Sequence, residues 1–174
     1  MFRTLSGTRG EASLFLNTQF DDYFAGCDII NGGMAVDQLS QLYQGHGYVL
    51  NIPAYQVKFE LYKVYQYWMA QQTLPPLTIF IDEFHLVGSR GSIEFPSDGV
   101  INADNVLGVI LTTGRHANIR LVMLTIKPQL VDANAYRCAR YHVMFEVDES
   151  DMNYFAQSCG LRFENPTGHD FIVV

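Results

Sequence analysis

A five-residue apolar run that ends in two carboxylates constrains the fold of this chain more than any other feature. Residues 77–81 read Leu-Thr-Ile-Phe-Ile, and Asp82 and Glu83 follow directly. A short, nearly continuous run of β-branched and aromatic residues is typical of a strand that is covered on both faces, as in a parallel sheet. Ligands of such sheets gather at the carboxyl ends of the strands, so we expect both carboxylates to lie at that edge.

Helix and strand patterns alternate on either side of this run. Apolar residues at helical spacing over residues 57–68 predict a helix, which Pro75 and Pro76 terminate. Similar patterns predict helices at 103–111 and 152–159, strands at 48–52, 121–125, 141–147 and 171–174, and a loop at 88–98. Near the amino terminus, residues 13–20 are expected to form a short helix.

The ends of the two later helices carry recognisable signals. Gly114 and Gly160 follow these helices, and glycine readily adopts the left-handed conformation that closes a helix. Ser150 is the expected N-cap of the last one. The alternation predicts an α/β fold of three layers, in which a parallel sheet lies between helices on both faces. A length of 174 residues with 48% hydrophobic content fits one domain over 1–174.

Three segments occur in an order and at a spacing that resemble the FtsK/HerA superfamily. They are Ile-Phe-Ile-Asp-Glu-Phe-His at 79–85, Leu-Thr-Thr-Gly-Arg-His at 111–116 and Leu-Val-Met-Leu-Thr-Ile-Lys-Pro at 121–128. The Thr-Gly-Arg-His segment looks closest to viral genome-packaging ATPases and to the Zot-like proteins of filamentous phages. The resemblance covers residues 48–174 and implies an additional-strand (ASCE, RecA-like) P-loop NTPase core.

The resemblance also implies a function. Members of the superfamily are ATP-driven motors, so we expect ATP and Mg²⁺ as cofactors, double-stranded DNA as substrate and a homo-oligomeric ring such as a hexamer. A viral capsid or a membrane-associated protein is a further expected partner. An alternative is a catalytically inactive ATPase-like subunit that serves as a DNA-binding or assembly scaffold.

Asp82 and Glu83 match the Walker B pattern, an apolar strand followed by two carboxylates. In this pattern the aspartate, here Asp82, holds Mg²⁺ through water, and the following carboxylate, here Glu83, polarises the water that attacks the γ-phosphate. An acidic pair after a strand is by itself often only a solvated turn or a helix cap. A metal-dependent phosphodiesterase site is a weaker alternative, because no further cluster of acids or histidines stands near the pair at regular spacing.

Two further roles follow from the resemblance. The family places a polar sensor, usually glutamine, at the tip of the strand over 121–125, where this chain has Ile126; Thr125 or Gln129 are the possible substitutes. An arginine acting across a ring interface is also implied, with Arg115 as first candidate and Arg140 as second. Either arginine is otherwise an ordinary surface residue.

The phosphate-binding loop is the feature that departs most from the family. A working loop reads G-x-x-x-x-G-K-[ST], and no such string occurs. Residues 1–47 are interpreted as a degraded phosphate-loop region, in which Gly7, Gly10 and Ser13 keep two glycines and a terminal hydroxyl, and Arg9 lies between the glycines.

The loop lacks the lysine that reaches the phosphates, and Glu11 adds a carboxylate that repels them. Three explanations stay open. The loop is a decayed relic, or an atypical loop binds nucleotide through Arg9 and Ser13 with Ser13 as a magnesium ligand, or a proper loop is carried on residues outside this chain.

Charge and cysteine content limit the remaining classes. A formal net charge of −7 argues against a protein coated in positive charge that wraps nucleic acid. The one local concentration of cations is Arg115, Arg120, Lys127, Arg137 and Arg140. This group is either a DNA contact or a solvated face. Three widely spaced cysteines indicate neither a disulfide framework nor a zinc site, and no run is long enough to span a bilayer. We therefore expect a cytoplasmic protein, in the host cytoplasm or the virion if it is viral.

Overall fold

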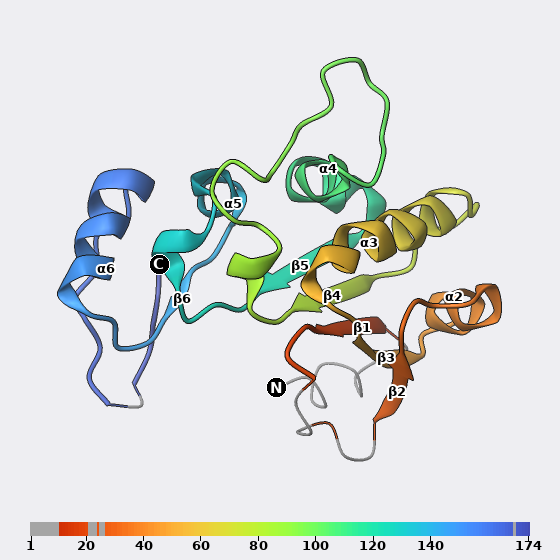
Figure 1. Ribbon diagram of the computed structural model, residues 1–174, viewed down its shortest axis with the longest axis horizontal. Coiled ribbons are helices and arrows are strands. Elements are labelled where there is room, and N and C mark those ends of the chain that lie inside the picture. Colours follow the sequence, from red (N-terminus) through yellow and green to blue (C-terminus); the bar gives the residue numbers. More distant parts are fainter. Residues whose placement is uncertain (1–10, 21–23, 25–26, 169) are drawn as a thin grey trace.

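A five-stranded parallel sheet forms the centre of the molecule. The computed structural model describes residues 11–20, 24, 27–168 and 170–174. The strands are β1 (Ala12–Asn17), β2 (Asp28–Asn31), β3 (Gly47–Asn51), β4 (Leu77–Ile81) and β5 (Ile119–Met123). They pair in the order β2-β3-β1-β4-β5 (Figure 1). The expected α/β fold with a parallel sheet is confirmed.

Residues 12–17 form the central strand, so the expectation of a short helix over 13–20 is wrong. All six residues of β1 are buried, and the strand pairs on both sides, with Leu14 opposite Tyr48 of β3 and Ile79 of β4. A short apolar run fits a buried helix and a buried strand equally well by pattern alone. Here pairing with two neighbouring strands decides for the strand.

Three helices connect the later strands, and all three pack on the same face of the sheet. They are α2 (Val36–Tyr43), α3 (Ala54–Met69) and α4 (Val106–Thr113). Their buried side chains join those of Leu14, Leu16, Ile79 and Ile81 in one core cluster. The steps from β2 to β3, β4 and β5 all run in one direction along the sheet, and right-handed crossovers in one direction place their helices on one face.

The opposite face carries a smaller aromatic cluster. Phe15, Val49 and Phe80 point to this side, where Phe24 and Cys27 from the connection between β1 and β2 pack against them. That connection runs in the reverse direction along the sheet, and therefore lies on the second face. The second helical layer expected from the sequence has no counterpart in the described part of the chain.

The long helix α3 supplies most of the helical contribution to the core. Val57, Leu61, Val64 and Trp68 follow one another at helical spacing and are at most 1% exposed, as the sequence predicted. Burying four such side chains contributes about 6–12 kcal/mol before conformational entropy is subtracted. The helix therefore fixes the position of β4, the strand that follows it.

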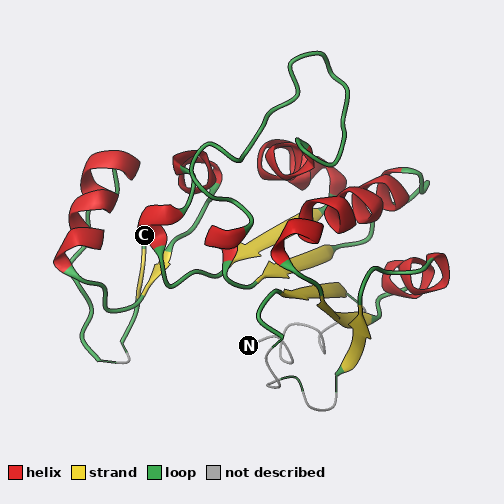
Figure 2. Cartoon of the chain, viewed as in Figure 1, coloured by secondary structure: helices red, strands yellow, loops and turns green. Residues whose placement is uncertain are grey.

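A long loop joins β4 to α4, as predicted for residues 88–98. After the short 3₁₀ turn η1 (Phe84–Leu86), the chain runs without regular helix or strand to Val106 (Figure 2). The loop crosses α4 at Gly108, where a side chain would clash with the main-chain oxygen of Glu94. The glycine therefore permits a close approach between the loop and the helix.

The end of α4 differs from the expectation. Gly114 is right-handed (φ −53°) and leads into the 3₁₀ turn η2 (Gly114–Ala117), and the left-handed residue is Asn118 (φ 56°). Asparagine tolerates this conformation, and the Asn118 side chain also donates to the carbonyl of Leu74 (2.9 Å). The left-handed residue thus lies four positions later than expected, after the 3₁₀ turn and beside the segment that leads into β4.

The carboxyl-terminal part adds short elements beyond β5. They are η3 (Pro128–Leu130), α5 (Ala133–Cys138), β6 (Val143–Met144), α6 (Glu149–Tyr154), the π-helical turn η4 (Phe155–Cys159) and β7 (Ile172–Val173). Strands β6 and β7 pair antiparallel and are shorter than expected. Asp148, not Ser150, caps α6 by accepting from the main-chain nitrogen of Asp151, whereas the left-handed Gly160 (φ 71°) closes this segment as predicted.

Candidate active site at the carboxyl edge of the sheet

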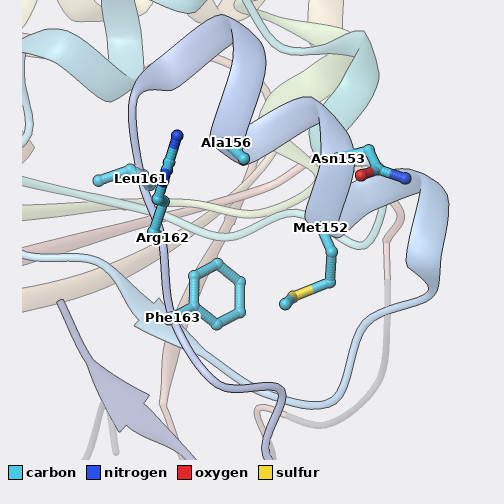
Figure 3. A pocket seen from close by; sticks show the side chains of 6 residues that line it. All are labelled: Met152, Asn153, Ala156, Leu161, Arg162 and Phe163. Carbon is cyan, nitrogen blue, oxygen red and sulfur yellow. The ribbon is translucent and has the colours of Figure 1, made fainter.

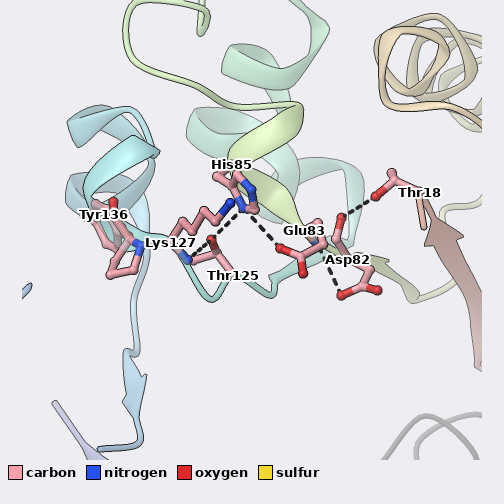
Figure 4. A network of polar contacts seen from close by, with 8 residues as sticks. Thr18, Asp82, Glu83, His85, Thr125, Lys127 and Tyr136 are labelled. Carbon is pink, nitrogen blue, oxygen red and sulfur yellow. Dashed lines mark hydrogen bonds and ion pairs between the residues drawn. The ribbon is translucent and has the colours of Figure 1, made fainter. Parts of the chain in front are cut away.

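Asp82 lies where the connections of two neighbouring strands leave toward opposite faces of the sheet. The chain after β1 turns to the aromatic face, and the chain after β4 turns to the helical face. The main-chain nitrogen of Asp82 donates to Leu16 (3.2 Å), and the hydroxyl of Thr18 donates to the carbonyl of Asp82 (3.2 Å; Figure 4). A crevice at such a point is the usual ligand position in open parallel sheets.

Glu83 is held in a costly conformation. Its backbone is left-handed (φ 46°, ψ 49°), which costs a residue with a side chain about 1–2 kcal/mol. Its Oε2 atom is buried and forms no aligned hydrogen bond within the described residues, although Nδ1 of His85 lies 3.1 Å away. A strained backbone on a residue with a buried carboxylate oxygen, at the carboxyl edge of the sheet, points to a functional constraint.

His85 is the polar neighbour of the Glu83 carboxylate. Its Nδ1 lies 3.1 Å from Oε2 of Glu83 and 3.1 Å from the hydroxyl of Thr125, and the ring is almost fully buried. In Figure 4 the carboxylate of Glu83 points toward His85, whereas that of Asp82 points away from it. The turn is fixed to β5 by a hydrogen bond from the nitrogen of Phe84 to the carbonyl of Leu124 (2.7 Å).

The two expected sensor substitutes after β5, Thr125 and Gln129, make different contacts. Thr125 lies against His85, and its oxygen also accepts from the nitrogen of Lys127 (3.1 Å). Gln129 donates instead to the hydroxyl of Ser150 (2.7 Å). Ile126 is 75% exposed. Thr125 is therefore the substitute that the fold joins to Glu83, through His85.

Three hydrogen-bonded asparagines form the carboxyl ends of the strands on the β1 side of Asp82. Nδ2 of Asn17 donates to Oδ1 of Asn51 (2.8 Å), and Nδ2 of Asn51 donates to Oδ1 of Asn31 (3.0 Å). Each is the last residue of its strand, β1, β3 and β2 respectively. Sequence reasoning missed this row, although each of the three strands ends in two apolar residues followed by asparagine, a repeated signal that could have indicated it.

Ser13 lies at the opposite edge of the sheet from Asp82. It is the second residue of β1, opposite Gly47 and Thr78 near the starts of β3 and β4. About 10 Å of strand separates it from Leu16, which contacts Asp82. The expected loop followed by a helix is wrong at Ser13, and the structure does not bring this hydroxyl to Asp82. Glu11, beside it, pairs with Arg120 (3.3 Å).

The other expected phosphate-loop residues are Gly7, Arg9 and Gly10. All three lie outside the described residues. At the carboxyl edge, the described chain provides Asp82, Glu83 and Thr125.

The two candidate arginines lie away from the carboxylates of their own chain. Arg115 is exposed in η2, just before β5 begins, and so lies at the amino edge of the sheet. Arg140 is exposed after α5, with its guanidinium 5.1 Å from the ring centre of Tyr141. The five expected basic residues are all exposed, but they are divided between the two ends of β5.

Oxygen donors at the carboxyl edge of the sheet fit a magnesium ion better than a transition metal. Magnesium is usually held by one or two carboxylates and keeps several waters, a role that suits Asp82. Within the described residues, no group of three or more His, Cys, Asp and Glu side chains is arranged to hold a metal ion. The described residues therefore form no zinc-type cage.

Two cavities in the described part of the chain lie elsewhere. One of about 180 Å³ is lined by Met152, Asn153, Ala156, Leu161, Arg162 and Phe163 (Figure 3). The other, of about 330 Å³, is lined by Arg90, Gly91, Asp132, Ala133, Tyr154 and Ser158. Nearby, burial raises the pKa of Tyr136, whose hydroxyl therefore stays protonated and donates to the carbonyl of Pro128 (3.1 Å). Neither cavity includes the carboxylates of β4.

Comparisons with known proteins bear on the fold. No family model matches the chain, and no curated protein matches its sequence significantly. The genome packaging NTPase B204 from Sulfolobus turreted icosahedral virus 2, solved in complex with ATP-gammaS, superposes with a TM-score of 0.66 and 12% identity, over 91% of this chain and 71% of that one. The DNA-packaging ATPase B204 from Sulfolobus Turreted Icosahedral Virus gives 0.61 and 13%, over 90% and 72%.

The N-terminal domain of zonular occludens toxin from Neisseria meningitidis matches more weakly, with a TM-score of 0.42 and 18% identity over 79% of this chain and 59% of that one. The fold is thus P-loop NTPase-like and matches packaging ATPase structures. The resemblance expected from the sequence is confirmed at the level of fold. None of the helices in the described residues has the length and apolar character needed to cross a bilayer.

Proposed function

We propose that this chain is an ATP-hydrolysing motor subunit that moves DNA, as in viral or phage genome packaging or export. The observation that carries the proposal is the position of Asp82 and Glu83 at the carboxyl end of β4, where the connections after β1 and β4 diverge, which is the usual ligand position in open parallel sheets. The similar B204 structures support it, because they are described as genome packaging NTPases and contain ATP-gammaS, AMP or AMPPCP.

In this proposal the two carboxylates have separate tasks. Asp82 holds the hydrated Mg²⁺, and that ion neutralises charge on the phosphates when it is bound. Glu83 accepts a proton from the attacking water, a contribution typically worth about 10²–10⁴-fold in rate. Thr125 takes the place of the missing glutamine at the tip of β5, where it and Glu83 both contact Nδ1 of His85.

We propose a ring, such as a hexamer, in which Arg115 serves a neighbouring subunit. Arg115 and Asp82 lie at opposite edges of the same sheet, so this arginine does not reach the phosphates of its own chain. Chains carrying Arg115→Ala, mixed with natural chains at varying ratio, should inhibit hydrolysis more steeply than dilution predicts. Inhibition in proportion to dilution would exclude this role and leave Arg140 as the candidate.

The partners in the proposal are double-stranded DNA and a viral capsid or membrane-associated protein. The exposed cations Lys127, Arg137 and Arg140 follow the carboxyl end of β5 and are the first candidates for DNA contact. Because the net charge of the chain is −7, such contact is local and should weaken as salt concentration rises.

A catalytically inactive ATPase-like subunit is the second candidate function. It is favoured by Ser13, which lies within a strand where a phosphate loop would require a turn, and by the exposed Ile126 at the usual sensor position. Such a subunit keeps the fold as a DNA-binding or assembly scaffold, and it predicts no nucleotide turnover.

One experiment separates the two candidates. Magnesium-dependent ATP hydrolysis and nucleotide affinity are measured, with and without DNA, for the natural chain, for Glu83→Gln and for the exposed control Glu164→Gln. The motor predicts hydrolysis that falls about 10²–10⁴-fold in Glu83→Gln, with nucleotide affinity retained and the control unchanged. Rates near zero for the natural chain and both variants would eliminate the motor.

A further inference from the structure

His85 contacts both Glu83, which follows β4, and Thr125, which follows β5. It belongs to η1, immediately after the acidic pair, and its ring is 7% exposed. One ring nitrogen, Nδ1, lies 3.1 Å from both Oε2 of Glu83 and the hydroxyl of Thr125 (Figure 4). These two residues come from the ends of neighbouring strands, β4 and β5.

The contact with Glu83 determines which ring nitrogen carries the proton. The contact is not aligned as a hydrogen bond, but an ionised carboxylate oxygen 3.1 Å away is attracted by a protonated Nδ1 and repelled by a nitrogen lone pair, which favours a proton on Nδ1. The alternative tautomer would place the lone pair of Nδ1 against a carboxylate oxygen. In a neutral ring, the proton on Nδ1 leaves Nε2 as the acceptor.

The same assignment determines the direction of the Thr125 hydrogen bonds. With a proton on Nδ1, the Thr125 oxygen is an acceptor toward His85, as it already is toward the nitrogen of Lys127. The hydroxyl proton of Thr125 is then not used in either contact. It is available for an acceptor bound beside Glu83, such as a phosphate oxygen or the attacking water.

The two oxygens of the Glu83 carboxylate have different surroundings in this arrangement. Oε2 is buried against His85, whereas the whole Glu83 side chain is 18% exposed. Oε1 is therefore the oxygen left to receive a proton from water. A carboxylate that is fixed through one oxygen presents the other in one orientation, which is what an in-line attack requires.

We propose that His85 is a positioning residue that orients the Glu83 carboxylate through Nδ1 and couples it to Thr125 at the tip of β5. This inference rests on the proposed ATP hydrolysis. Through His85, the tip of β5 controls the orientation of the Glu83 carboxylate, the proposed general base.

Steady-state kinetics test the positioning role. His85→Leu should lower kcat about 10–100-fold, because a misdirected base loses rate while substrate binding is kept, and KM should change less than about threefold. His85→Asn places an amide N–H near the position of Nδ1, and kcat should stay within about fivefold of the natural value. His46→Asn, a histidine at the amino edge paired with Asp28, is the matched control and should leave kcat unchanged.

A spectroscopic measurement tests the contact without any turnover. In the natural folded chain labelled with ¹⁵N-histidine, two-bond nitrogen–proton correlations should show the Nδ1-protonated tautomer for His85, and Glu83→Gln should alter that pattern. A Nε2-protonated ring that does not respond to Glu83→Gln would overturn the inference, even if His85→Leu fails to fold.

The two proposals fail in different ways. If the natural chain hydrolyses ATP and His85→Leu keeps the natural kcat, the positioning role is refuted and the motor stands. If the natural chain shows no hydrolysis, the proposed function itself fails, and the positioning role fails with it because there is no base to orient.

Discussion

The hydroxyl of Thr18 donates a hydrogen bond to the main-chain carbonyl of Asp82 across 3.2 Å, and so joins the residues that follow β1 and β4. The two residues are 64 positions apart in sequence. Both lie at the carboxyl edge, where the chain from β1 and the chain from β4 turn to opposite faces. This hydrogen bond attaches the backbone of Asp82 to the chain that follows β1, on the side of β4 opposite β5.

Thr18→Val should therefore weaken both the fold and the site. Valine keeps the shape of threonine but removes the donor, and the loss of one such hydrogen bond costs about 1 kcal/mol. Urea unfolding should show a lower midpoint with an unchanged slope. Thr112→Val is the matched control, because its hydroxyl bonds only within α4, to Gly108 (2.8 Å). Equal effects of both substitutions would show that the contact with Asp82 adds nothing.

Ile126→Gln should change neither stability nor hydrolysis, although it restores the usual sensor residue. The Ile126 side chain is 75% exposed, and surface substitutions usually stay within about 0.5 kcal/mol. Thr125→Val, in contrast, removes a hydroxyl in contact with His85 and should lower kcat about tenfold. Steady-state kinetics of both variants check this. A gain of activity in Ile126→Gln would assign the sensor role to position 126 instead.

The ion pair between the buried Glu60 and the partly exposed Lys63 should be a major contributor to stability. The carboxylate of Glu60, 5% exposed, lies 2.9 Å from the Lys63 ammonium and also accepts from the nitrogen of Met34 (3.1 Å). Glu60→Leu leaves that nitrogen without its acceptor and should cost about 3 kcal/mol. A double-mutant cycle with Lys63→Met, followed by urea unfolding, measures the coupling.

The exposed pair of Arg120 and Glu11 provides the comparison. Its side chains are 59% and 28% exposed, so Glu11→Gln should cost less than about 1 kcal/mol. A cost for Glu60→Leu as small as that for Glu11→Gln would show that the pair on α3 is not important for folding.

Stability should fall in mildly acidic solution through His142. Burial lowers the pKa of this ring from its usual value of 6.5, so the unfolded chain binds its proton at a higher pH than the folded chain. The contribution of His142 to stability is therefore complete above pH 6.5 and is lost as pH falls below that value. The urea midpoint between about pH 5 and 7.5 should depend less on pH in His142→Gln than in the natural chain. Identical pH profiles would refute the expectation.

Local sequence patterns were sufficient for much of the fold. The apolar run of β4 and the stripe of α3 were predicted at their positions, because pairing and burial of these segments repeat a strong local pattern. The position of Asp82 and Glu83 at a carboxyl edge followed from the same reasoning. The run at 12–17 was interpreted wrongly, because a short apolar segment has no periodicity that separates strand from helix.

By itself, then, the sequence determined the kinds of elements and the residues that end them, since these depend on neighbours a few positions away. The tertiary structure alone decided which ends meet. The contacts of His85 with Thr125 and of Asn17 with Asn51 join residues 40 and 34 positions apart. They depend on strand order and register, which are set by pairing between distant segments and leave no local trace in any one of them.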